Sequence, residues 1–102
     1  MRDFKGKSVN ANYIGNMTYI GKIWFYEDAY EFKAESVNSQ ISMGKILYRD
    51  IKAVVAANTL GIIPNSLIVE LHDGRRFQYV VIKRKEVMLF LCAQIAREKG
   101  ER

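Results

Sequence analysis

The chain contains few of the residues on which most reaction centres and covalent cross-links depend. Its 102 residues include one cysteine, one histidine and one proline. A lone cysteine excludes a disulfide within the chain, and one cysteine with one histidine cannot supply a zinc site of familiar spacing. No apolar run approaches the roughly 20 residues of a membrane-spanning helix, and none follows the N-terminal residues as in a signal peptide. We therefore expect a soluble, cytoplasmic protein that carries no metal and no cofactor.

The remaining composition is sufficient for a packed interior. Apolar residues make up 49% of the chain and aromatic residues 12%, which argues against disorder. A chain of this length has room for one hydrophobic core. We expect a single domain over residues 1–102, with 1–6 and 99–102 flexible at its ends. Cys92 is interpreted as a small buried hydrophobe.

The charge balance is basic, with 16 lysine and arginine residues against 11 acidic ones and a formal net charge of +5. Such a surplus favours contact with acidic proteins, lipid headgroups or nucleic acid, without choosing among them. The basic residues that lie closest together in the sequence are the candidate anion contacts, although solvation of an ordinary surface also explains them. They are Arg75, Arg76, Lys83, Arg84 and Lys85.

Alternation of apolar and polar residues predicts strands over most of the chain. In the segment 8–13 every second residue is apolar, which is the period of a half-buried strand. Residues 36–40 and 58–66 are interpreted as loops, and Asp73-Gly74 is typical of a type I′ hairpin turn. A bulge near Asp50 would explain a change of face within one long strand. Strands are expected at 8–13, 18–26, 29–34, 46–56, 67–71 and 77–82.

The end of the chain predicts one amphipathic helix that begins near Arg84 and ends at Gly100, a residue suited to a C-terminal cap. Apolar residues recur there at spacings of three and four, which predicts a stripe facing the core. The expected core-facing residues are Met88, Leu91, Cys92 and Ile95, widened by Val87. The expected solvent-facing residues are Gln94, Arg97 and Glu98.

Four segments in this order resemble the GRAM and pleckstrin-homology-like superfamily. They are Gly21–Phe25 with Tyr30–Phe32, Ile46–Val54, Leu67–Leu71 with Asp73-Gly74 and Phe77–Tyr79, and Lys85–Ile95. The resemblance implies a mainly β fold: a bent antiparallel barrel of about seven strands, capped by one C-terminal α-helix. Many pleckstrin-homology domains bind inositol phosphates with basic residues around their first hairpin turn. The corresponding turn, Tyr13–Thr18, has no lysine or arginine, so no lipid-binding residue is carried over.

Catalysis is not expected. His72 adjoins a predicted turn, where a general base would lack both a partner and a cleft. The carboxylates are interpreted as surface charges, and the glycines are too far apart in the sequence to form a phosphate-binding loop. The chain is therefore interpreted as a non-catalytic binding module.

Protein contact, including self-association, is the first hypothesis for that module. Apolar residues of the 58–66 loop and two helix residues off the main stripe are the candidate partner contacts. These residues are Leu60, Ile62, Ile63, Leu89 and Phe90.

Peripheral binding to anionic lipid headgroups is the alternative, with the 58–66 loop inserting beside basic residues. In a third interpretation, Ile62 and Ile63 fold back over the open end of the barrel. Nucleic acid is not expected as a partner: Tyr19, Trp24 and Tyr26 could form a stacking face, but packing within the bent sheet is the favoured interpretation.

Overall fold

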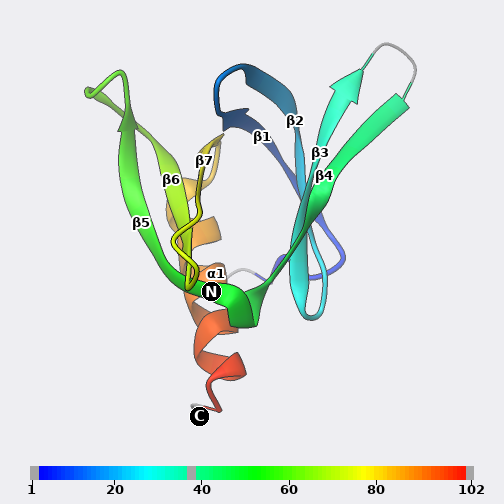
Figure 1. Ribbon diagram of the computed structural model, residues 1–102, viewed down its shortest axis with the longest axis vertical. Coiled ribbons are helices and arrows are strands. Elements are labelled where there is room, and N and C mark those ends of the chain that lie inside the picture. The colour runs from blue at the N-terminus through cyan, green and yellow to red at the C-terminus, as the bar shows by residue number, and fades with distance from the viewer. Residues whose placement is uncertain (1–2, 37–38, 101–102) are drawn as a thin grey trace.

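Seven antiparallel strands form one strongly bent sheet in the computed structural model, which describes residues 3–36 and 39–100 (Figure 1). The strand order is β4-β3-β2-β1-β7-β6-β5, and each neighbouring pair is antiparallel. One helix, α1, follows the last strand. The elements are β1 (Ser8–Ile14), β2 (Thr18–Phe25), β3 (Ala29–Ser36), β4 (Ser39–Leu47), β5 (Ile51–Thr59), β6 (Ile63–Leu71), β7 (Arg76–Val81) and α1 (Arg84–Glu98).

The concave face of the sheet carries the core, as the alternation predicted. Ile23 and Phe25 of β2 pair with Phe32 and Tyr30 of β3, and all four side chains are buried. Gly21 allows the two strands to approach closely there, because a Cβ at this position would lie 2.1 Å from the Lys33 carbonyl oxygen. The tight pairing of β2 with β3 thus depends on a residue without a side chain.

Helix α1 closes one end of the bent sheet. The Phe90 ring lies at its centre, with ring centroids 5.2 Å from Phe25, 5.6 Å from Phe4 and 6.4 Å from Tyr48. Phe90 was a candidate partner contact, and that prediction is wrong because its side chain is fully buried. The core-facing residues of the helix are Val87, Phe90, Leu91, Gln94 and Ile95.

The helix face is therefore rotated from the predicted stripe. Cys92 is exposed although it was expected to be buried, and Gln94 is buried although it was expected in solvent. Met88 is half-buried at the margin. The error has a simple cause: apolar residues occupy most positions from 87 to 92, so several stripes fit the helical period equally well. The Phe4, Phe25 and Tyr48 rings decide which one packs.

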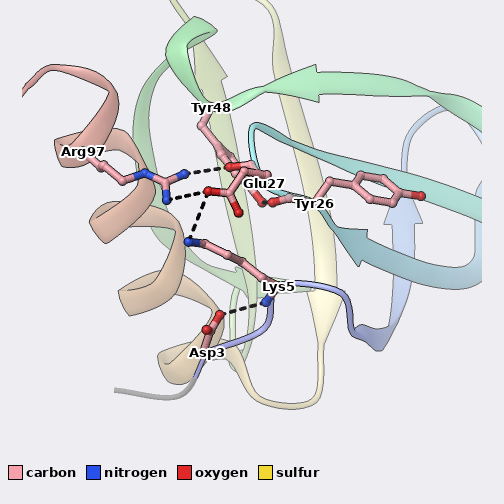
Figure 2. A network of polar contacts seen from close by, with 6 residues as sticks. All are labelled: Asp3, Lys5, Tyr26, Glu27, Tyr48 and Arg97. Carbon is pink, nitrogen blue, oxygen red and sulfur yellow. Dashed lines mark hydrogen bonds and ion pairs between the residues drawn. The ribbon is translucent and has the colours of Figure 1, made fainter.

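The start of the chain also contributes to the core. Of the ends 1–6 and 99–102 that were expected to be flexible, positions 1, 2, 101 and 102 lie outside the described residues, whereas Phe4 is only 3% exposed. Figure 2 shows the polar contacts that surround this segment. Arg97 of α1 donates to the Glu27 carbonyl oxygen at 2.7 Å and to its carboxylate at 3.2 Å, and Lys5 lies 3.7 Å from the same carboxylate. The last turn of α1, the β2–β3 turn and the N-terminal segment are thus joined at one place.

The expected strand at 46–56 and the expected loop at 58–66 have different bounds in the structure. The chain turns within the first, and strand pairing continues into the second. The expected strand at 46–56 is divided by a 3₁₀ turn, Tyr48–Asp50, rather than bent by a bulge. The turn is fixed by Tyr48, which is buried and donates its hydroxyl to the Tyr26 carbonyl oxygen at 2.9 Å. The predicted 58–66 loop is mostly strand, since β5 and β6 extend to a short turn at 60–62.

Two other predicted turns also differ in the structure. Strand structure covers most of the 36–40 loop, except that positions 37 and 38 lie outside the described residues. At the β6–β7 turn, Gly74 has a positive φ of 92° but Asp73 does not. A type I′ turn requires positive φ at both central residues, so that turn type was wrong.

Strands β4 and β5 form the two edges of the sheet and diverge from the 3₁₀ turn (Figure 1). The tips of the β1–β2 and β5–β6 hairpins lie at the upper end of this view, together with the end of β3 and the start of β4, and α1 extends to the lower end. The molecule therefore has one end closed by the helix and a second end formed by hairpins.

Candidate contact surface

The two most exposed large apolar residues of the described chain, Leu60 at 86% and Ile62 at 78%, lie at the tip of the β5–β6 hairpin. Ile63 beside them is 42% exposed. The interpretation in which this segment folds back over the open end is therefore wrong. These three candidate contacts instead form the projecting apolar tip, the name used below for residues 60–63.

Leu60 occupies a backbone conformation that its side chain disfavours. Its φ is 54°, the only positive φ of a non-glycine residue in the described chain, and Gly61 follows with a φ of 75°. The Ile62 amide donates to the Thr59 carbonyl oxygen at 3.2 Å, which closes a two-residue turn of type I′ character. Asparagine or glycine normally occupies such a position. An exposed leucine there adds strain without contributing to the core.

Of the two helix candidates, only Leu89 reaches the surface, with 51% of its area exposed. Together with Met88, Cys92 and Ala56 it lines an open, mainly apolar depression of about 320 Å³ beside the start of α1. The structure therefore separates the two neighbours that the sequence grouped together: Leu89 faces outward and Phe90 inward.

The candidate anion contacts fall into two groups at different places. Arg75 pairs with Asp73 at 2.8 Å, and Arg76 lies 4.0 Å from Glu70, so both arginines of the β6–β7 turn have acidic neighbours. The backbone amide of Arg75 and its guanidinium also lower the pKa of Asp73. This turn adjoins the 3₁₀ turn, since the His72 amide donates to the Asp50 carbonyl oxygen at 3.0 Å.

The second basic group lies at the start of α1, beside the β5–β6 hairpin. Arg84 donates from Nη1 to the Ala57 carbonyl oxygen at 2.9 Å and to the Ser66 carbonyl oxygen at 3.4 Å. Its guanidinium therefore ties the helix to the hairpin, whereas Lys83 and Lys85 on either side are exposed. Leu60 follows Ala57 by three residues, which corresponds to about 10 Å of extended chain. The apolar tip and two lysines thus share one end of the hairpin.

Other exposed apolar side chains continue this pattern along the hairpin end. Met17 lies in the β1–β2 turn, and Ile41 and Met43 lie in the outer half of β4. Isolated exposed apolar residues are ordinary, but several at one end of a molecule favour an interaction surface there. The large exposed apolar residues at the hairpin ends are Met17, Tyr19, Ile20, Ile41, Met43, Leu60, Ile62 and Ile63.

The concave face of the sheet, next to the hairpin ends, holds an aromatic cluster that the sequence reasoning missed. Tyr13, Phe32, Phe77 and Tyr79 line a cavity of about 40 Å³, which is far below the size of a ligand pocket. The Tyr79 and Tyr30 hydroxyls lie 3.1 Å apart, and burial raises the pKa of both groups. The aromatic cluster stiffens the sheet next to the hairpin ends, and its cavity has no space for a substrate.

His72 lies in the β6–β7 turn, and Glu31 lies in β3. His72 is exposed in its turn, and the described chain contains no group of three or more potential metal ligands. Glu31 accepts hydrogen bonds from the Ser42 hydroxyl and, at 2.7 Å, from the Tyr26 hydroxyl; the Ser42 bond chiefly lowers its pKa. Within residues 3–36 and 39–100, no helix is long and apolar enough to cross a membrane.

The three aromatic residues considered for nucleic-acid stacking do not share a face. Tyr19 pairs with Tyr13 near the concave side. Trp24 and Tyr26 lie on the opposite side, where Lys33 is 5.5 Å from the Trp24 ring and Lys45 is 4.7 Å from the Tyr26 ring. The favoured interpretation, packing within the bent sheet, was also incorrect for Trp24 and Tyr26.

Comparison with known proteins supports the fold. No family model matches the chain, and no curated protein matches it. Among solved structures it is similar to the crystal structure of the C-terminal domain of an unknown protein from Leishmania infantum, with a TM-score of 0.72 at 16% identity. That match covers 87% of this chain and 81% of the other. A likeness at this identity concerns the fold alone. The expected fold class, a mainly β fold in which a bent antiparallel sheet of seven strands is capped by one C-terminal helix, is confirmed.

Proposed function

We propose that the chain is a non-catalytic binding module that acts through protein contact at its hairpin end, self-association included. The observation that carries the proposal is Leu60, an apolar residue that is almost fully exposed in a left-handed turn position. Fold stability does not explain a leucine at position 60, because asparagine would relieve the strain and keep the turn. A contact surface explains it, since a large apolar side chain at an apex can enter a partner's pocket.

The rest of the molecule is consistent with this proposal. The hairpin end concentrates exposed apolar side chains, whereas the aromatic cavity on the concave face is too small for a substrate. We propose membership of the GRAM branch of pleckstrin-homology-like domains on the resemblance of the four segments described above. We also propose a cytoplasmic location, which suits the exposed single thiol of Cys92.

A second candidate function is peripheral binding to an anionic membrane. The observation that favours it is the shared location of the apolar tip, Lys83 and Lys85. Interfacial elements bury apolar side chains about 5–10 Å into the headgroup boundary, a depth similar to the distance by which the tip extends beyond Arg84. Lys83 also borders an open groove of about 370 Å³ that includes Lys7 and Ile82.

Gel filtration of a cell extract prepared without denaturant tests the first proposal, because it measures the apparent mass of the chain with any bound partner. The wild-type chain should elute in gel filtration well above its own mass of 11.8 kDa. Replacing Leu60 and Ile62 together by asparagine should shift its elution to a clearly smaller mass. Lys52→Asn, at an exposed site near the opposite end of β5, is the matched control and should leave the complex intact. A wild-type chain that elutes as a monomer would contradict the proposal.

Vesicle sedimentation separates the membrane candidate from protein contact. Vesicles rich in phosphatidylserine should pellet the wild-type chain more than neutral phosphatidylcholine vesicles do. Lys83→Glu combined with Lys85→Glu should reduce this binding, because each basic residue near an anionic surface contributes about 1 kcal/mol. Equal or absent pelleting with both vesicle types would remove the membrane candidate and leave the protein-contact proposal unaffected.

A further inference from the structure

Strand β4 leaves one edge of the sheet uncovered. It pairs with β3 on one side and terminates the sheet on the other. All seven residues of Ser39–Lys45 are exposed. The opposite edge, β5, differs because α1 and the Arg84 guanidinium lie against it. β4 is therefore the edge of the described sheet that is available to another strand.

Edge strands are usually protected by charge, proline or a bulge. In β4 the protection is confined to the inner half. The register shifts between the pairs of Glu31 and Lys33, which places a bulge at Met43-Gly44, and Gly44 has a φ of 94°. The Lys45 ammonium lies over the Tyr26 ring. The outer segment, Ser39–Met43, has neither a charge nor a proline.

We infer that Ser39–Met43 pairs in antiparallel fashion with the same segment of a second copy, about a two-fold axis at Ile41. This inference rests on the proposed function and names the partner as another copy of this chain. The five-residue segment is Ser-Gln-Ile-Ser-Met, and five residues is a usual strand length. A two-fold axis at its centre gives a self-complementary interface, as symmetric dimers require.

The side chains of the segment favour this register. Ile41 is 56% exposed and would lie opposite Ile41 of the second copy, so that two apolar side chains cover each other. Gln40 would lie opposite Ser42 of the second copy, which pairs polar residues. Ser39 would lie opposite Met43 of the second copy. The absence of charge in the segment removes the like-charge repulsion that usually opposes pairing of identical strands.

Sedimentation velocity of the purified chain over about a hundredfold range of concentration tests association, because the dimer population follows mass action. The wild-type mass should rise from that of the monomer toward twice that value. Ile41→Lys should remain monomeric, because it places two ammonium groups opposite each other. Leu60→Lys makes the same change in charge at the other hairpin and should dimerise as the wild type does. Circular dichroism should show both variants folded.

Cysteine cross-linking tests the register in a Cys92→Ser background, which removes the exposed native thiol. Ile41→Cys should form a disulfide dimer under mild oxidation, because opposite residues of antiparallel strands lie about 4.5–5.5 Å apart at Cα. Ser39→Cys should not, since its expected partner is Met43. Equal cross-linking of the two variants, or none at Ile41→Cys, would overturn the inference.

The outcomes separate this inference from the proposed function. If the purified wild type stays monomeric while the chain in cell extract remains in a larger complex, the β4 inference fails and the contact proposal stands. If Leu60→Lys abolishes the dimer and Ile41→Lys does not, self-association uses the apolar tip, and the β4 inference fails. A dimer that only Ile41→Lys abolishes supports the pairing.

Discussion

Leu60→Asn should make this protein more stable, although it replaces a large apolar residue by a polar one. The left-handed conformation costs an ordinary L-residue about 1 kcal/mol, and asparagine adopts it readily. Leu60 is 86% exposed, so the substitution removes little buried area, worth about 0.3 kcal/mol for a side chain whose full burial contributes about 2 kcal/mol. The net expected gain is about 0.7 kcal/mol.

Thermal unfolding measures this gain. For a domain of this size, 1 kcal/mol shifts Tm by about 4–8 °C, so Leu60→Asn should raise Tm by about 3–6 °C. Ile62→Asn is the control, because Ile62 is similarly exposed but has an ordinary φ; it should not raise Tm. A lower Tm for Leu60→Asn would refute the reasoning, since it would mean that the leucine side chain supports the fold.

Two further predictions concern the packing of the helix and a buried carboxylate. Phe90→Ala should destabilise the protein by about 3–5 kcal/mol, because it empties a site among three rings. Leu89→Ala should change stability by less than about 0.5 kcal/mol. Urea unfolding of the two variants checks both values, and equal losses of stability would contradict the assigned helix face. The Glu31 carboxylate has a folded-state pKa below its ordinary value because the Ser42 hydroxyl donates to it. Its stabilisation should therefore be fully present above the ordinary glutamate pKa of about 4.3 and be lost as pH falls through the lower folded pKa. The stability difference between wild type and Glu31→Gln should shrink in acid, and a constant difference from neutral pH to pH 2 would argue against this role.

The strands could be predicted because their residues alternate, and alternation depends on local sequence alone. Ile23, Phe25, Tyr30 and Phe32 face the core as expected. The helix face could not be read in the same way, because long-range contacts with Phe4, Phe25 and Tyr48 select Phe90 from several suitable apolar residues. The presence of the helix could be predicted from the local sequence. The face that the helix turns toward the core could not, because it depends on tertiary contacts.

The candidate surface was predicted in part for a related reason. The apolar character of residues 60–63 is visible in the sequence, but their exposure depends on how far β5 and β6 pair. The Leu60-Gly61 turn lacks the asparagine or aspartate that usually identifies such hairpins, so the segment was interpreted as a loop. The proximity of Lys83 and Lys85 to the tip follows from the Arg84 contact with β5 and β6, which no local pattern reveals. The bare β4 edge likewise requires the strand order of the whole sheet.

A photo-crosslinking comparison of the two ends of the molecule in cells tests the central claim most directly. A photoreactive residue at exposed position 17, 41 or 62 lies at the hairpin end, and one at exposed position 49, 72 or 98 lies near the end closed by α1. We predict discrete protein adducts from the first group and little or none from the second. Adducts that arise equally from both groups, or only from the helix end, would contradict a contact surface at the hairpins.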